Sequence, residues 1–145
     1  MSSDHSVTDL QELNQRGQGM LPGHLGIVFT EASADCIKAH LPVAQHVMAP
    51  NGYLHAGSVV TLADTACGYG CRMHLPPTAS GFTTVELKSN HLGTARDGHI
   101  DCVAKPVHLG RTTQVWDAVV THRESGKTVA LFRCTQMVLY PVAKG

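Results

Sequence analysis

One long stretch of small and apolar residues, followed by four strand-like segments, leaves few folds open to this chain. The stretch covers residues 56–74 and ends before Pro76 and Pro77, which predicts a helix that is buried around most of its circumference. The segments after it are rich in β-branched and aromatic residues and cover residues 82–92, 98–107, 112–122 and 128–140. One helix and several strands joined by short turns predict an α+β domain with one antiparallel sheet, not a βαβ fold.

The chain before this helix predicts three further elements. Residues 7–16 read as a short amphipathic helix that ends near Gly17, and residues 25–32 and 36–43 read as two short strands, which gives a sheet of about six strands. We expect the second strand to be an edge strand, because Pro42 cannot donate to a ladder.

The same patterns suggest how the later strands are arranged. Consecutive strands after residue 82 are close enough in sequence to pair as antiparallel neighbours. Pro106 predicts a bulge or an edge position near the end of its strand. We expect residues 1–145 to form one domain, with residues 1–20 as an N-terminal helical extension.

The composition excludes several classes of protein. Apolar residues make up 43% of the 145 residues, so the chain is too apolar to be disordered. Eleven basic residues balance eleven acidic ones, and no basic cluster is present, which argues against a nucleic-acid partner. Charged residues make up only 15%, against roughly 25% in a typical soluble domain, which suggests that part of the surface is buried against other copies of the chain.

The sequence also predicts a cytoplasmic protein without metal or cofactor. The polar, acidic start does not fit a signal peptide, and polar residues such as Asp64 interrupt the most apolar run before it could span a membrane. We expect the five cysteines to be reduced, since their number is odd and none forms a CxxC pair. The ten histidines form no metal-binding motif, and we expect Cys67, Cys71, Trp116 and Phe132 to serve packing.

Asp64 is the first candidate for chemistry. It lies within the apolar helix between Ala63 and Thr65, where a carboxylate is costly unless it is paired, hydrogen-bonded or exposed to a cavity. An Asp bonded to a neighbour or turned to solvent explains the position as well as a functional role does.

The start of the helix is the second candidate. Residues 51–57, NGYLHAG, lead into it, and the first turn of a helix presents unpaired N–H groups at the positive end of its dipole. The small side chains at Ala56 and Gly57 leave these groups open to an anion or to the oxygen of a carbonyl under attack. The alternative is an ordinary capping turn, in which His55 is structural.

The spacing of the two candidates has a consequence. Ala56 and Asp64 are eight residues apart, about 12 Å along a helix axis. A catalytic group must lie about 3 Å from the atom that it attacks, close to the oxyanion donors. If both candidates are functional, a second copy of the chain must supply one of them.

These residues also resemble a known family. The stretches NGYLHAGSVVTLADTACGYG, GFTTVELKSNHLGTARDG and HLGRTTQVWDA are similar to the hotdog-fold acyl-CoA thioesterases of the phenylacetate-degradation (PaaI) type, over roughly residues 20–140. In that family His-Gly-Gly is followed seven residues later by Asp in a Leu-Ala-Asp-Thr context. Here His55 is followed by Ala56 and Gly57, and Asp64 lies in that context, so the first glycine is replaced by alanine. Asn51 stands closer to the His than the Asn of many members.

The resemblance implies a fold, a reaction and a set of roles. The fold would be a long central helix wrapped by a curved antiparallel sheet, in subunits that pair through the sheet and commonly form tetramers. Asp64 would attack the thioester or activate water, and the N–H of Ala56 or Gly57 would bind the carbonyl oxygen. Asn51 and His55 would shape that subunit's contribution. A hydroxyl on the following strand, Thr84 in preference to Thr83, would position the water or the acyl group.

Residues that bind coenzyme A are less clearly marked. Arg111, which matches the family's loop, lies in a turn with Gly110, Thr112 and Thr113 and is the candidate that we favour for the pantetheine or a phosphate. Arg96 and Lys105 are further candidates for the nucleotide phosphates, although most such cations are ordinary solvated surface charges.

The sequence therefore predicts hydrolysis of aryl or medium-chain acyl-CoA, with two alternatives. One is an enoyl-CoA hydratase or dehydratase on the same fold, although the carboxylate stands nine residues after His55, which does not match the helix motifs of those enzymes. The other is a non-catalytic acyl-CoA-binding protein. Acyl specificity is not readable, nor is the choice between nucleophile and general base for Asp64.

Overall fold

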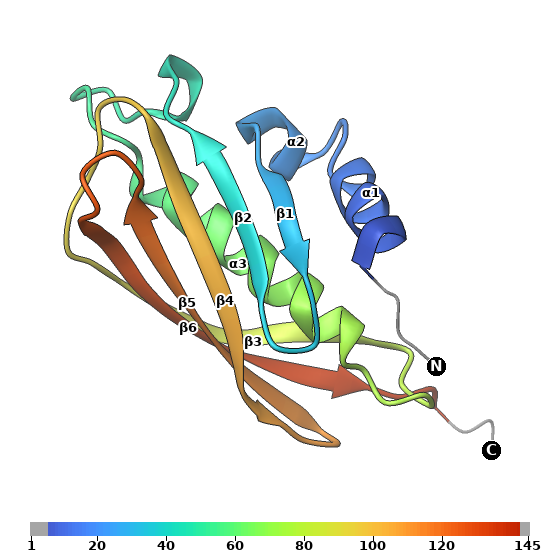
Figure 1. Ribbon diagram of the computed structural model, residues 1–145. Coiled ribbons are helices and arrows are strands. Elements are labelled where there is room, and N and C mark those ends of the chain that lie inside the picture. The colour runs from blue at the N-terminus through green and yellow to red at the C-terminus, as the bar shows by residue number, and fades with distance from the viewer. Residues whose placement is uncertain (1–5, 143–145) are drawn as a thin grey trace.

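A curved antiparallel sheet wraps one long helix, α3 (Ala56–Met73), in this computed structural model, which describes the backbone of residues 6–142 and the side chains of residues 10–142 (Figure 1). The strands lie in the order β1-β2-β4-β5-β6-β3. Their bounds are β1 Val28–Ala32, β2 Ile37–Pro42, β3 Gly81–His91, β4 His99–Leu109, β5 Thr113–His122 and β6 Thr128–Leu139. The predictions of one long helix, a six-stranded antiparallel sheet and an α+β class are confirmed.

The core lies between α3 and the inner face of the sheet. Alternate residues of β5 and β6 are buried, as the period of two in a strand requires, and Trp116 is the largest side chain that is fully buried. Val59, Leu62, Ala66 and Cys67 are buried on α3, and Phe132 and Cys71 are buried as well, in agreement with their predicted packing roles.

Two predictions about the sheet are wrong. β3 does not pair with β4, the next strand in the sequence, but with β6, because the loop between β3 and β4 carries the chain to the other side of β5 and β6. β2 is not an edge strand, since it pairs with both β1 and β4. Pro42 is tolerated there because it is the last residue of the strand. The edges are β1 and β3.

The elements around the sheet follow the sequence closely. α1 (Ser6–Arg16) ends where Gly17 predicts, and the side chain of its Asn14 accepts from the N–H and donates to the C=O of Phe29 on edge strand β1, at 2.8 and 3.1 Å. The expected loop before β1 instead contains the short helix α2 (Leu21–Leu25), so β1 begins only at Val28. The register of β4 shifts after Pro106, which confirms the predicted bulge.

The remaining elements lie at the start of α3. A 3₁₀ helix, η1 (Gln45–Val47), follows β2 and leads into the turn before α3 (Figure 1). No helix within residues 6–142 is long and apolar enough to cross a membrane.

Candidate active site at the start of α3

His55 caps α3 and thereby decides which amide of the first turn stays free. Its Nδ1 accepts from the N–H of Gly57 at 2.7 Å, and its carbonyl accepts from the N–H groups of Ser58 and Val59. The N–H of Ala56 has no hydrogen-bond partner among the described residues. Because Nδ1 accepts, the proton of the neutral ring lies on Nε2. The amide of Ala56 is therefore the free backbone donor at the mouth of the helix, and Nε2–H is the free donor of the exposed His55 ring.

Gly57 has a steric reason to be glycine. A Cβ at this position would lie 2.9 Å from Nδ1 of His55 and 3.1 Å from Cε1. Any larger residue would therefore push the imidazole away from the amide that it caps. Of the two amides that the sequence offers as oxyanion donors, the amide of Gly57 is already bonded, and the amide of Ala56 is the free one.

A tight turn before the helix positions Asn51. The N–H of Ala49 donates to the carbonyl of Tyr53 at 2.7 Å, and the N–H of Gly52 donates to the carbonyl of Ala49. The side-chain oxygen of Asn51 accepts from the N–H of Tyr53 at 3.1 Å, so it closes the turn. Asn51 thus keeps its amide NH₂ group for another partner.

A cavity of about 370 Å³ opens at this mouth; we call it the mouth cavity. Ala56 and Asn51 line it, together with residues that the sequence did not single out for a site: Ala49, Tyr53, Leu54, Val59, His91, Gly93, Thr94 and Val129. His91 and Thr94 come from the end of β3 and the loop after it, about 40 residues from the turn in sequence. No local motif joins these two segments, so only the packing of β3 beside α3 shows that they belong to one cavity.

Asp64 is partly buried, and no hydrogen bond among the described residues compensates for the burial of its Oδ1. Its Oδ1 is buried and has no hydrogen-bond partner among the described side chains. Burial raises the pKa of Asp64 above 3.8, its ordinary value. It lies on the same unbroken helix as Ala56, so the separation of about 12 Å that the spacing predicts applies here. The ordinary structural explanation of an Asp bonded to a neighbour does not hold for this oxygen.

Thr84 lies on the helix side of β3. It pairs across strands with Gln136, and its hydroxyl donates to the buried side-chain oxygen of Gln136 at 2.6 Å. Thr83 pairs with the exposed Met137 on the opposite face. Of the two threonines that the resemblance suggests, only Thr84 shares a side of the sheet with α3, and its oxygen remains free to accept.

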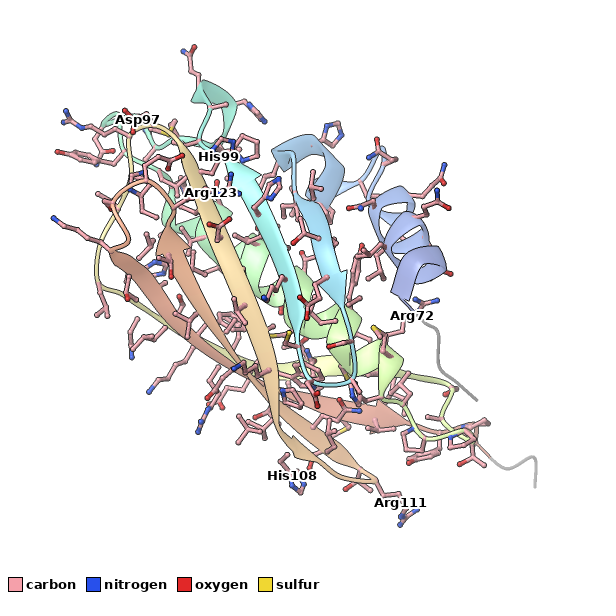
Figure 2. All side chains as sticks on the ribbon, viewed as in Figure 1. Arg72, Asp97, His99, His108, Arg111 and Arg123 are labelled. Carbon is pink, nitrogen blue, oxygen red and sulfur yellow. The ribbon has the colours of Figure 1, made fainter. Side chains whose placement is uncertain are left out.

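The cations expected to bind coenzyme A lie at opposite ends of the sheet. Arg111 is in the turn between β4 and β5, far from Asp97 and Arg123 (Figure 2). Its carbonyl accepts from the hydroxyl of Tyr140, while Gly110 and Thr112 form backbone bonds to Thr113 and Val138. Arg96, one residue before Asp97, lies at the end that carries the helix mouth, with its guanidinium 4.4 Å from the centre of the Tyr53 ring. The third cation, Lys105, is exposed on β4.

Comparisons with known proteins show the family of this chain. The model of the Thioesterase superfamily matches residues 51–129, which contain the mouth, Asp64 and β3. The chain is 33% identical to 1,4-dihydroxy-2-naphthoyl-CoA hydrolase of Escherichia coli, over 90% of this chain and 94% of the relative. It is 35% identical to the putative esterase ComA2 of Bacillus subtilis, over 79% and 90%.

A solved structure matches nearly the whole chain. The crystal structure of a mutant of thioesterase PA1618 from Pseudomonas aeruginosa superposes with a TM-score of 0.87 at 30% identity, and it covers 97% of each chain. A helix wrapped by a six-stranded sheet in the order found here is thus the hotdog fold of that structure. The chain belongs to the thioesterase superfamily.

Proposed function

We propose that this protein hydrolyses acyl-CoA thioesters, with aryl or medium-chain acyl groups, to the free acid and CoA. The observation that carries the proposal is that one helix holds two groups without hydrogen-bond partners among the described residues: a free amide at its start and, eight residues later, the buried Oδ1 of the partly buried Asp64. The first can stabilise a developing oxyanion, and the second can act on the carbonyl carbon or on water.

In the proposed reaction, the thioester carbonyl lies in the mouth cavity with its oxygen on the N–H of Ala56. Nε2–H of His55 is the second donor, and the NH₂ group of Asn51 lies beside them. Asp64 of a second subunit either attacks the carbonyl carbon, which releases the thiolate and gives an anhydride that water hydrolyses, or takes a proton from the attacking water. Thr84 accepts a hydrogen bond from that water or positions the acyl group. Either route yields one carboxylic acid and one thiol per water consumed.

The proposal requires an oligomer, because one helix cannot bring its own Ala56 and Asp64 to one carbonyl. We propose a dimer that joins the exposed edge strands β3, where Val85 and Leu87 are 52% and 41% exposed, and a tetramer formed by two such dimers. Arg111, Gly110 and Thr112 then contact CoA that is bound at a neighbouring subunit.

The reaction needs no metal and no cofactor, since CoA is part of the substrate and a thioester is already electrophilic. We further propose that the protein acts in the cytoplasm. The five unpaired thiols support a reducing compartment.

A thiol-release assay over acyl-CoAs of varied length and aromaticity tests the reaction. We expect wild type to release CoA and Asp64→Asn to be at least about 10³-fold slower, since it loses the carboxylate but keeps the shape of the side chain. An Asn variant with undiminished turnover removes Asp64 from the mechanism, and binding without release by wild type would identify a binding protein instead.

A mixed oligomer tests the shared site. Ala56→Pro removes the amide donor at the first position of the helix, where proline is tolerated, and His55 already has the extended backbone (φ −69°, ψ 134°) that a residue before proline prefers. We expect a heterodimer of Asp64→Asn with Ala56→Pro to regain about half of the wild-type activity, because one of its two sites has both groups. If correctly assembled heterodimers regain no activity, the two groups do not come from different subunits, and the shared site is wrong.

A further inference from the structure

The two edges of the sheet differ in what they leave open to another chain. β3 is eleven residues long, and among residues 6–142 its backbone forms hydrogen bonds only to β6. β1, at the opposite edge, is five residues long, and its register with β2 shifts between Phe29 and Glu31. α1 lies beside β1 (Figure 1). A long bare edge offers unpaired N–H and C=O groups to another strand, whereas a short, irregular or covered edge does not.

The side chain of Asn14 on α1 closes the centre of β1. Its Oδ1 accepts from the N–H of Phe29 at 2.8 Å, and its Nδ2 donates to the C=O of the same residue at 3.1 Å. Facing residues of an antiparallel ladder exchange the same pair of bonds, so the carboxamide lies where a residue of a seventh strand would lie. Two residues earlier, the N–H of Ile27 donates to the C=O of Pro22 at 3.0 Å. The N–H groups at both positions are therefore bonded within the protomer.

α1 is fixed in the position from which Asn14 reaches β1. Leu13, the residue before Asn14, is 2% exposed and packs in the core. In the turn from α1 to α2, the N–H of Gly23 donates to the C=O of Gly17 at 2.9 Å, and a Cβ at Gly23 would lie 2.3 Å from that oxygen. Because the turn is this tight, Asn14 meets β1 without a loose loop to order.

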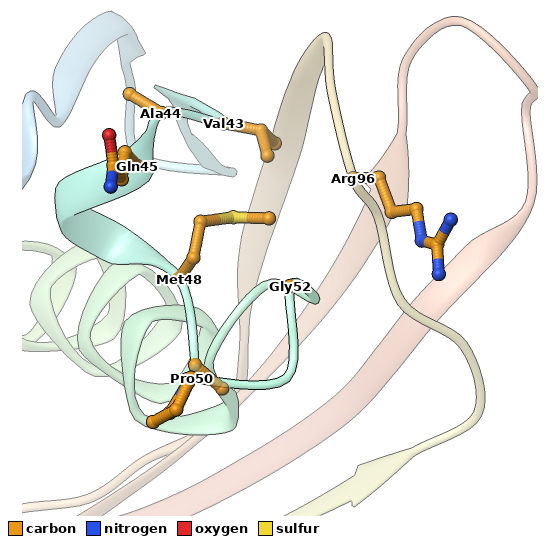
Figure 3. A pocket seen from close by; sticks show the side chains of 8 residues that line it. Val43, Ala44, Gln45, Met48, Pro50, Gly52 and Arg96 are labelled. Atoms are coloured by element: carbon orange, nitrogen blue, oxygen red, sulfur yellow. The ribbon is translucent and has the colours of Figure 1, made fainter.

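The open edge β3 leads to the mouth of α3. Past the end of β3, the loop that carries Arg96 passes the turn that holds Met48 and Gly52 (Figure 3). The C=O of Ala95 in this loop accepts from the N–H of Leu54 at 2.9 Å, just before the helix. A copy that pairs along β3 therefore lies next to the candidate site, whereas one that pairs along β1 lies at the other edge of the sheet.

Identical sheets can pair their edges in three ways. β3 with β3, or β1 with β1, closes by two-fold symmetry into a dimer. β1 with β3 leaves one edge free at each end, so that copies continue to add without closure. If β1 is closed, only the pairing of β3 with β3 is left.

Resting on the shared site of the proposed function, we propose that Asn14 closes β1 against a second copy of this chain and so restricts assembly to β3 with β3. Loss of the carboxamide opens β1 to the β3 edge of another copy, and assembly then continues beyond the dimer. Each contact of that kind also occupies a β3 edge that the shared site needs.

Light scattering after size exclusion, over a range of concentrations, compares wild type with Asn14→Ala, Asn14→Ser and the matched control Gln15→Ala, an exposed neighbour on α1. We expect the masses of wild type and Gln15→Ala to level off at one value, because a closed assembly stops growing. The mass of Asn14→Ala should exceed that of wild type at least about twofold and keep rising with concentration. Asn14→Ser should rise less, since its hydroxyl cannot bridge both backbone groups. Turnover per subunit should fall as the mass rises.

Hydrogen exchange of the Phe29 amide identifies the edge that is used. In dilute Asn14→Ala this amide has lost its acceptor and should exchange at least about 10-fold faster than in wild type. It should slow again at the concentrations where the mass has risen, because a second copy then covers it. Circular dichroism at each concentration checks that the variants are folded.

A folded Asn14→Ala with the mass of wild type at every concentration overturns the proposal, and so does equal growth of Gln15→Ala. Growth that leaves the Phe29 amide unprotected overturns it as well, because the copies then meet elsewhere. If Asn14→Ala does not fold, Asn14→Ser is held to the same results. If wild type itself is a monomer, the shared site of the proposed function fails, while the masses and the Phe29 exchange of the variants still decide the role of Asn14.

Discussion

The first and last turns of α3 are built from the same kinds of small residue and use them for opposite purposes. At the start, Ala56 and Gly57 are exposed, and their small size leaves the backbone open to a guest. Near the end, Gly70 is buried so closely under Trp116 that a Cβ there would lie 2.5 Å from the indole ring. A small residue in a helix therefore says only that something approaches the backbone, and its neighbours decide whether that is a ligand or a side chain of the core.

Asp64 lies between these two regions. Cys67, one turn later, is fully buried and has its thiol pKa raised by a hydrogen bond with Cys134 and by burial. The partly buried carboxylate thus stands between the exposed first turn and the closely packed last turn, with buried residues of the core on both sides of it in the sequence. Variants at the open start of the helix should change the reaction rate, and variants at its packed end should change the free energy of unfolding.

Among the variants on either side of Asp64, the largest effect is expected for Ala56→Pro at the open end. Loss of one oxyanion donor should lower kcat about 10²- to 10³-fold. The free energy of unfolding should change little, because this amide makes no hydrogen bond within the described residues. Ala56→Gly, which keeps the N–H, is the control and should retain activity within a few fold. A fully active proline variant would mean that another donor binds the oxygen.

Gly70→Ala at the packed end should give the opposite result. The added methyl group meets Trp116, and overpacking of this kind costs about 1–3 kcal/mol of unfolding free energy, with activity per folded molecule retained. Urea denaturation measures the loss. Gly68→Ala is the matched control, because its Cβ would lie 3.5 Å from Phe82, an ordinary contact, and should stabilise the helix by up to about 1 kcal/mol. Equal stabilities for the two variants would contradict the assigned packing.

Gly57→Ala tests the cap of His55. The new Cβ displaces the imidazole, so we expect kcat to fall about 10-fold as the Nε2 donor loses its orientation. The loss of the cap and the gain in helix propensity, each about 1 kcal/mol, should nearly cancel in stability. Circular dichroism and the thiol assay together check this, and unchanged kinetics would show that His55 takes no part in the reaction.

The smallest effect concerns pH. Burial raises the pKa of Asp64 above its ordinary value of 3.8, so the folded protein holds the proton more tightly than the unfolded chain does. Its contribution to stability is full below pH 3.8 and is lost as the pH rises through the folded-state pKa. Wild type should therefore lose stability relative to Asp64→Asn over that range in urea titrations at several pH values, whereas activity, which needs the carboxylate, should rise over the same range. A constant difference between the two proteins would contradict a raised pKa.

Local patterns predicted much of the fold. The small residues and the two prolines set the bounds of α3 within one residue, and the four later strands were placed within a few residues. The neighbours of β2 and β3 were predicted wrongly, because strand pairing depends on contacts between segments far apart in the sequence. The edge position predicted from Pro42 was wrong for a related reason, since the effect of a proline on strand pairing depends on whether it lies inside the strand or at its end.

In the candidate site, too, some features follow from the sequence and others only from the tertiary structure. The sequence by itself determined the chemical groups and their spacing on one helix: an amide-rich mouth and Asp64 eight residues later, a separation that requires a second copy if both groups act on one carbonyl. Only the tertiary structure decided that the His55 ring occupies the Gly57 amide and leaves that of Ala56 free, that His91 joins the mouth cavity, and that Arg96 lies beside Tyr53 while Arg111 lies at the far end. The physical reason is range: spacing along a helix is fixed by its geometry, whereas the meeting of residues 43 positions apart is fixed by the packing of the whole sheet.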